Sequence, residues 1–182
     1  YNTAHGYRAL YANTTGSNNT ASGWEALYLN TTGNNNTATG EAALYSCITG
    51  NYNTAVGYYA LFNTPYAWGN TAVGDIAGAS YTNGYYNTFI GAETDATAPD
   101  IYNSTALGRL TYVTASSQVR IGNSFVTSIG GYAGWSNISD GRYKKNVKQN
   151  VPGLAFINKL HPVTYTLDIA GIDNKLHSQN AQ

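Results

Sequence analysis

Carboxylates and histidines are the side chains of this sequence with the widest catalytic use. Six acidic residues lie within the first hundred positions: Glu25, Glu41, Asp75, Glu93, Asp95 and Asp100. Hydrolysis of a glycan needs two carboxylates that face each other across a groove, and only the last three of these acids are close in sequence. The histidines at positions 5, 161 and 177 are far apart. We therefore expect no metal site and no cofactor, and glycan hydrolysis stays open as an alternative.

Asparagine and threonine recur every 17 residues in the motif Asn-Thr-Ala-x-Gly. The motif and its weaker copies end at seven glycines that keep this spacing without insertion: Gly6, Gly23, Gly40, Gly57, Gly74, Gly91 and Gly108. A period this short fits one coil of a solenoid and not an independent domain. The sequence therefore predicts an all-β fold, a parallel β-solenoid of about seven 17-residue coils.

Stacked coils would align equivalent residues into columns. One column contains asparagines whose side-chain amides can hydrogen-bond from coil to coil, among them Asn19, Asn36, Asn53 and Asn70. A second column contains threonines, among them Thr20, Thr37, Thr54 and Thr71. We interpret both columns as structural ladders. A threonine array can also bind ice or another surface, but this array is one residue wide, which favours the ladder.

A second glycine column follows the first within each coil: Gly16, Gly33, Gly50 and Gly84, with Ala67 in the gap. Two glycine columns predict two tight turns where φ is positive. The runs between them are rich in Thr, Tyr and Val and favour strands, so each coil is expected to be strand, turn, strand, turn. Cys47 is the only cysteine and stands where Asn13 and Asn30 stand, so we interpret it as a variant ladder position.

The residue before the first glycine changes from polar to apolar along the chain: His5, Ser22, Thr39, Val56, Val73, Ile90 and Leu107. The preceding position is Ala in every coil except one, which has Phe89. Because side chains alternate between the faces of a strand, both faces of the later strands are apolar or small. One face can line the solenoid interior and the other needs a cover. We infer association of copies of this chain, most simply as a symmetric oligomer.

The composition is poor in charge without being that of a disordered chain. Charged residues make up 10%, hydrophobic residues 42%, and the net charge is zero. This combination fits a solenoid, or an oligomer that hides much of its surface. Neutrality argues against nucleic acid as a partner, and no apolar run is long enough to insert into a membrane. Because the chain lacks Met and opens in phase with the repeat, we interpret it as a fragment or a processed product.

The repeat fades after Gly108, and the runs 119–123 and 126–131 are expected to be further strands in a different register. Charge then rises sharply between Asp140 and Lys148, which marks a boundary just before residue 140. We therefore divide the chain into a repeat region (1–115), transition strands (116–138) and a short α+β C-terminal segment (139–182).

The repeats resemble the heads of YadA-like trimeric autotransporter adhesins and related bacterial and phage fibre proteins, which contain similar Asn-Ser/Thr-x-Ala-Ile/Val-Gly coils. The resemblance covers about residues 1–115, although the period here is longer than that of the common head coil. It implies a parallel β-roll in a homotrimer that is exposed on a cell surface, secreted or part of a virion. A surface glycan or a host receptor would then be the external partner.

A nine-residue stretch resembles the start of the intramolecular chaperone of endosialidase-type tail spikes and tail fibres: Ser139-Asp140-Gly141-Arg142-Tyr143-Lys144-Lys145-Asn146-Val147. The family pattern is Ser-Asp-x-Arg-aliphatic-Lys-x-Asn-Ile/Val, so Tyr143 departs from it. The resemblance implies self-cleavage at Ser139–Asp140, with Ser139 as nucleophile and Lys144 as general base. A desolvated lysine of lowered pKa can take the hydroxyl proton. From the residue types alone, the stretch would be a solvated loop, and residues 139–182 would hold only the truncated start of such a chaperone.

The sequence thus predicts a structural and adhesive fibre whose C-terminal segment belongs to a trimerisation and folding chaperone. Self-cleavage is the only enzymatic activity indicated, and none on external substrates is expected. Aromatic residues such as Tyr7, Trp24, Tyr58 and Tyr59 could stack on sugars or pack between subunits. A glycan-degrading tail spike and an ice- or surface-binding solenoid stay open as alternatives.

Overall fold

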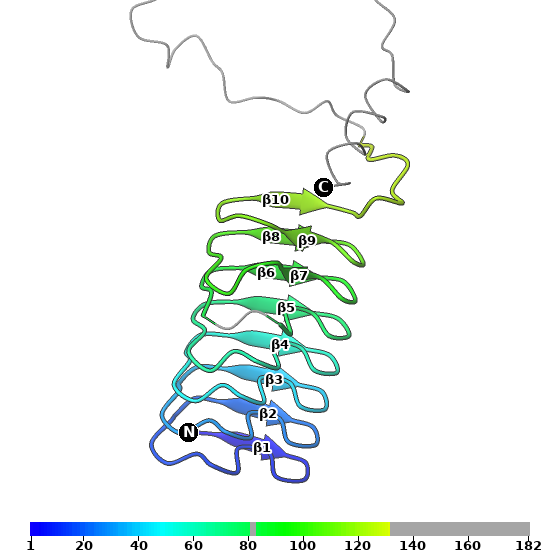
Figure 1. The fold of residues 1–182 in the computed structure, drawn as a ribbon. Coiled ribbons are helices and arrows are strands. Elements are labelled where there is room, and N and C mark those ends of the chain that lie inside the picture. Colours follow the sequence, from blue (N-terminus) through cyan, green and yellow to red (C-terminus); the bar gives the residue numbers. More distant parts are fainter. Residues whose placement is uncertain (81–82, 132–182) are drawn as a thin grey trace, which may run out of the picture. The chain divides into compact units, whose positions relative to one another are not determined.

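One three-residue strand per coil builds the main sheet. The structure, a computed structural model, describes residues 1–80 and 83–131. The strands of this sheet, in spatial order, are β1 (Thr3–His5), β2 (Thr20–Ser22), β3 (Thr37–Thr39), β4 (Thr54–Val56), β5 (Thr71–Val73), β6 (Thr88–Ile90), β8 (Thr105–Leu107) and β10 (Val119–Ile121). All neighbours are parallel, and the described residues contain no helix (Figure 1). This part of the chain is a parallel β-solenoid of about seven turns, which confirms the predicted all-β architecture.

The register of the sheet follows the sequence repeat until the last strand. Thr37 pairs with Thr54, and Thr54 pairs with Thr71, each 17 residues later. In contrast, β10 pairs with β8 through Val119 and Thr105, an offset of 14 residues. The run 119–123 therefore contains a strand in a changed register, as predicted. The prediction of a strand at 126–131 is wrong, because the chain turns after β10 and leaves this run exposed and without strand pairing.

The segment after the first glycine of each coil is a turn in the early coils, so the prediction of a second strand there is wrong. Its backbone alternates in hand, with φ at 55° for both Arg8 and Leu10. The N–H of Leu10 still donates to the carbonyl of Ala26 in the next coil, at 3.0 Å. Hydrogen bonds thus join the coils without an extended backbone. A second strand forms only later, where β7 (Asp95–Ala96) pairs with β9 (Tyr112–Val113).

The two glycine columns differ in backbone conformation and in what limits their side chains. Gly40 has a φ of 129°, and a Cβ there would lie 2.4 Å from the carbonyl oxygen of Gly57 in the next coil. Gly33 lacks a positive φ, which corrects the expectation for the second column, but a Cβ there would lie 2.3 Å from the oxygen of Gly50. The positive φ of that turn belongs to Asn35, at 58°. Close stacking of the coils, not a positive φ, therefore favours glycine at Gly33, although Ala67 is buried at the equivalent position two coils later.

Alanine and leucine columns form the apolar interior. The middle residue of each strand of the main sheet from β2 to β8 is fully buried, and so are Leu27, Leu44 and Leu61 in the turns. Position 78 continues the leucine column as glycine, and the nearby alanine column becomes Phe89. A Cβ on Gly78 would lie 2.8 Å from Cδ2 of Phe89, so the loss of one side chain makes room for the other. The interior keeps its packing through this exchange.

Candidate functional site

The predicted cleavage site lies outside the described residues. Ser139, Lys144 and the Ser139–Asp140 bond all follow residue 131, where the described part ends. Candidate sites are therefore sought on the solenoid, in its interior columns and on its surface.

The asparagine column is a continuous hydrogen-bonded ladder through the interior. The N–H of Asn36 donates to Oδ1 of Asn19 at 2.9 Å, and its Nδ2 donates to the carbonyl of Gly50 at 2.7 Å. Asn53 and Asn70 repeat both contacts at 2.8–3.0 Å. These four side chains are at most 1% exposed. Each amide is satisfied by the neighbouring backbone, so the column holds coils together and is not available to a ligand.

The ladder that contains Cys47 is interrupted at this residue. Nδ2 of Asn30 donates to Oδ1 of Asn13 at 2.8 Å, but Oδ1 of Asn30 has no hydrogen-bond partner in the described part of the chain. The next position in the column is Cys47, which is fully buried. Burial raises the pKa of the Cys47 thiol to about 12, so the thiol stays protonated and unreactive at neutral pH.

The threonine column lies on the outer face of the sheet, because the middle residue of each strand points inward. Thr20 and Thr37 are exposed, whereas Thr54 and Thr71 are half-buried. Neighbouring strands pair threonine with threonine, so the column is continuous. It is one threonine wide, and from β4 onward an apolar column runs beside it. This geometry differs from the broad flat threonine array that the ice-binding alternative would need.

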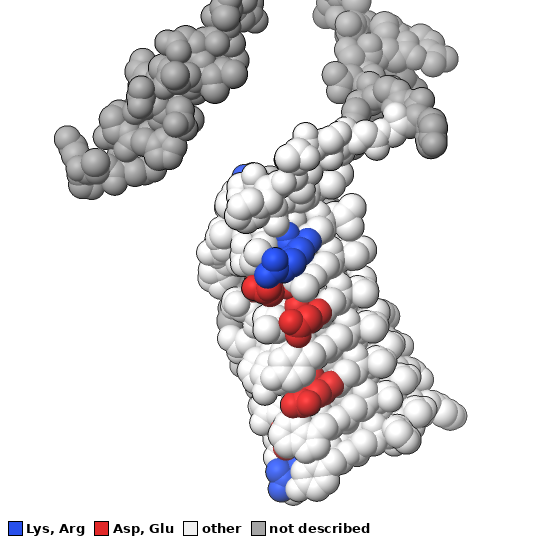
Figure 2. Space-filling view, turned by 90° about the vertical axis from the view of Figure 1, so that its right-hand side faces the viewer, with Lys and Arg blue, Asp and Glu red and all other residues white. Residues whose placement is uncertain are grey.

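Acidic side chains lie along one face of the solenoid, with basic side chains near both ends (Figure 2). Of the three acids that are close in sequence, Glu93 forms an ion pair with Arg109 at 3.1 Å. Asp95 is 6% exposed, and its two carboxylate oxygens accept the backbone N–H groups of Ser80 and Ala96. These contacts give both carboxylates structural roles. No group of three His, Cys, Asp or Glu side chains in the described ranges is placed to bind a metal ion.

The outer face of the sheet carries an apolar stripe over its C-terminal half. We define the outer stripe as the last residues of β4, β5, β6, β8 and β10: Val56, Val73, Ile90, Leu107 and Ile121. Their exposed fractions lie between 38% and 40%. In β1, β2 and β3 the same column contains His5, Ser22 and Thr39. The structure thus places an uncovered apolar column beside the threonines, on the face for which the sequence predicted a partner.

A second uncovered surface was missed by the sequence reasoning. We define the aromatic ridge as five exposed residues in the turn that precedes the strand: Tyr52, Trp68, Tyr85, Tyr86 and Tyr102. Positions 68, 85 and 102 keep the 17-residue spacing, and isolated parallel bridges join their backbones. This spacing was the signal in the sequence. It was overlooked because the same column begins with Ser17, Asn34 and Asn51.

Comparison with protein-family models, with curated proteins and with solved structures finds no match to this chain. Within the ranges that the structure describes, no helix has the length and apolar character of a membrane span. The resemblance to adhesin heads and tail-fibre chaperones therefore rests on the motif residues alone. Any function has to be argued from the ladders, the outer stripe and the aromatic ridge.

Proposed function

We propose that this chain is a segment of a structural and adhesive fibre in which three copies associate through the outer stripe. The observation that carries the proposal is the exposure of this apolar column on a parallel sheet. The opposite face of the same sheet is already filled with alanine and Phe89. Parallel sheets with two apolar faces are normally covered on both sides. The outer stripe is a second apolar face of this sheet, so it favours a partner whose own apolar surface would cover it.

A copy of the same chain is the partner that this surface suits best. The stripe runs parallel to the stacking direction, and its residues are branched and apolar in every strand of the main sheet from β4 onward. Three such stripes around a common axis would bury one another, which gives a closed assembly without a free apolar face. The resemblance of the repeats to trimeric adhesin heads supports the number three. Exposure at a cell surface, in a secreted fibre or on a virion agrees with this role.

The C-terminal segment is proposed to start a trimerisation and folding chaperone, on the resemblance of residues 139–147. Oγ of Ser139 would attack the carbonyl carbon of the Ser139–Asp140 bond and form an ester, while Lys144 accepts the hydroxyl proton and passes it to the departing amino group of Asp140. Water would then hydrolyse the ester and restore the hydroxyl. Mass spectrometry of the chain after expression tests this part. A new terminus at Asp140 in the wild type, absent from Ser139→Ala, is expected, and identical uncut masses for both would remove the cleavage proposal.

Replacing stripe residues by threonine tests the assembly proposal. Threonine already occupies this column at Thr39, so Ile90→Thr/Leu107→Thr keeps the coil intact while it makes the outer face polar. Ile76→Thr is the matched control, because Ile76 is also 39% exposed but lies in a turn. Sedimentation velocity should show a trimer for the wild type and the control, and dissociation for the double variant. Unchanged assembly of the double variant would refute the role of the stripe.

A further inference from the structure

We propose that the aromatic ridge binds a linear, uncharged carbohydrate along the stacking direction of the coils. This inference rests on the proposed adhesive function and names the ligand class and the residues that would bind it. The ridge spans the consecutive turns that contain Tyr52, Trp68, Tyr86 and Tyr102. It is narrow, because each turn contributes only one or two rings. An extended chain molecule matches this shape better than a broad macromolecular surface does.

The rings of the ridge are arranged so that some of their faces stay open. Tyr52 meets Trp68 edge-to-face at 5.4 Å and 77°, and Trp68 meets Tyr86 at 4.8 Å and 84°. Tyr85 meets Tyr86 at 5.7 Å and 76°. In an edge-to-face pair, the edge of one ring contacts a face of the other ring. The contact therefore leaves both faces of the first ring uncovered. Exposed fractions of 38% for Trp68 and 54% for Tyr86 agree with open ring surfaces.

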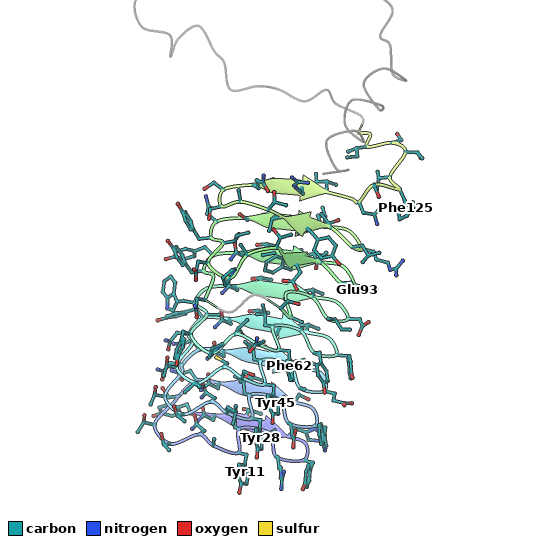
Figure 3. All side chains as sticks on the ribbon, viewed as in Figure 1. Tyr11, Tyr28, Tyr45, Phe62, Glu93 and Phe125 are labelled. Atoms are coloured by element: carbon teal, nitrogen blue, oxygen red, sulfur yellow. The ribbon has the colours of Figure 1, made fainter. Side chains whose placement is uncertain are left out.

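A second aromatic column of the molecule shows the contrasting arrangement. Tyr11, Tyr28, Tyr45 and Phe62 lie one above another along the stack (Figure 3). Their ring centroids are 5.1–5.4 Å apart and their planes differ by 11–18°. Each inner ring of this column therefore covers the faces of its neighbours. Within the ridge, Tyr85 and Tyr102 also stack, at 5.0 Å and 5°, and cover one face of each other. The edge-to-face contacts around Trp68 leave the ring faces that an external ligand could use.

Two residues of the ridge adopt a backbone conformation that is unfavourable for their side chains. Tyr52 and Tyr86 have φ values of 59° and 57°, in the left-handed region that is unfavourable for a bulky side chain. The same column has Asn18, Asn35, Gly69 and Asn103, which tolerate this conformation better. Tyrosine at these two positions therefore costs stability that asparagine would not. Positive φ also occurs at Leu27, Leu44 and Ile76 in the other turn, so it belongs to the coil and does not by itself mark a site.

The position of Tyr86 depends on the missing side chain of Gly69. A Cβ on Gly69 would lie 3.0 Å from Cδ1 of Tyr86, so the ring packs over the glycine of the preceding coil. The N–H of Tyr86 donates to the carbonyl of Trp68 at 3.0 Å, and the N–H of Gly69 donates to that of Asn51 at 2.9 Å. These backbone bonds hold the rings in place before any ligand binds. A pre-organised platform lowers the entropic cost of binding.

The polar groups of the ridge suit a ligand rich in hydroxyls and without charge. The five ridge residues are uncharged, and in the described part of the chain their tyrosine hydroxyls make no hydrogen bond. Asn103 and Ser117 beside the ridge are exposed amide and hydroxyl groups, 3.3 Å apart. Tyrosine presents an apolar ring and a polar hydroxyl together, which matches the apolar face and the hydroxyl rim of a pyranose.

Titration of the full chain with oligosaccharides tests the proposal. The probes are the linear hexasaccharides of β-1,4-glucose, β-1,4-N-acetylglucosamine, β-1,4-mannose and β-1,4-galactose, with hexagalacturonate as the anionic comparison. Isothermal titration calorimetry is run on the wild type and on Trp68→Asn/Tyr86→Asn. Asparagine occupies the equivalent positions at Asn51 and Asn103, so the double variant is expected to fold. Trp24→Ala is the control, because Trp24 is 46% exposed on another turn and its column contains Ala92.

We expect at least one neutral hexasaccharide to bind the wild type and the control equally. Its dissociation constant should rise about tenfold or more in the double variant, as for the loss of a central aromatic residue. Failure of all four neutral probes at millimolar concentration, equal affinity of the double variant, or preference for hexagalacturonate would each overturn the proposal. A changed native mass of the double variant would assign the ridge to contacts between copies instead. If the sugars fail while the mass stays that of a trimer, the fibre proposal remains intact.

Discussion

The first three coils and the coils from β4 onward share the buried asparagine ladder and differ on their outer face. Asn36 in β3's coil and Asn70 in β5's coil make the same two hydrogen bonds. On the outer face, the same columns change from Thr39 to Val56 and from Asn51 to Trp68. In a solenoid each coil contacts only its neighbours, so surface residues can change without altering the register. The interior residues determine the conformation of the coil, and the surface residues determine which molecules the coil can contact.

The largest effect is expected for glycines that both halves share. Gly40→Ala in the early half and Gly91→Ala in the late half each place a Cβ against the next coil, at φ near 130°. We expect each to lower the free energy of unfolding by about 3 kcal/mol or more, from overpacking together with backbone strain. Urea denaturation followed by circular dichroism measures this loss. A loss of stability for only one of the two variants would contradict the claim that the coils contact each other in the same way in both halves.

Gly130→Ala is the matched control for these two substitutions. A Cβ on Gly130 has nothing within 4 Å. Its stability should stay within about 0.5 kcal/mol of the wild type, as for most surface substitutions. A loss as large as that of Gly40→Ala would mean that the contacts between coils are not the cause.

The next effect concerns the buried asparagine ladder in the two halves. Asn36→Ala leaves the carbonyl of Gly50 and the N–H of Asn53 without partners, and Asn70→Ala does the same to Gly84 and Asn87. Each should cost about 2–3 kcal/mol, because unsatisfied buried groups keep their desolvation penalty. Thermal unfolding by calorimetry measures the two costs.

Asn2→Ala is the comparison within the same column. Asn2 donates to the carbonyl of Gly16 and accepts the N–H of Asn19, but it is exposed at the end of the stack, so water can replace both contacts. Its cost should be about 1 kcal/mol, below that of the buried positions. Equal losses at the exposed and the buried positions would contradict the assignment of the cost to burial.

The smallest effect is expected at the interruption of the ladder by Cys47 in the early coils. Cys47→Asn would supply an amide donor to the unpaired Oδ1 of Asn30. We expect a gain of about 1 kcal/mol in unfolding free energy, measured beside Cys47→Ala, which supplies no donor. Because burial raises the thiol pKa to about 12, iodoacetamide at pH 8 should label the wild type only after unfolding. Rapid labelling of the folded chain, or no gain from asparagine, would show that the ladder continues differently here.

The 17-residue period was enough to predict one strand per coil, the register of these strands as far as β8, and the columns. The pairing of Thr37 with Thr54 follows from it directly, since like residues stack when coils repeat without insertion. The period could not predict the backbone between the glycines. The run after Gly6 has residues that favour strands, but burial of the leucine column and bonds between coils hold Arg8 and Leu10 at positive φ. Tertiary contacts outweighed local preference there.

The candidate surfaces were predictable only in part, for the same reason. Alternation along a strand placed Val56 and Ile90 on the face opposite alanine, and the structure has them exposed. The aromatic ridge could be recognised only in the structure, because the orientation of the Trp68 and Tyr86 rings depends on the space that Gly69 leaves open. Sequence spacing brings those residues together but does not distinguish stacked rings from edge-to-face rings. The roles of Ser139 and Lys144 stay predictions, since both lie outside the described residues.

Native mass spectrometry of the unmodified chain tests the central claim most directly. If other copies cover the outer stripe, the particle should contain three chains. Its mass should be three times 19.4 kDa for the uncut chain, or three times the mass of residues 1–139 after cleavage at Ser139–Asp140. Moderate dilution should leave this mass unchanged. A stable particle with the mass of a single chain, with the stripe open to water, would contradict the account.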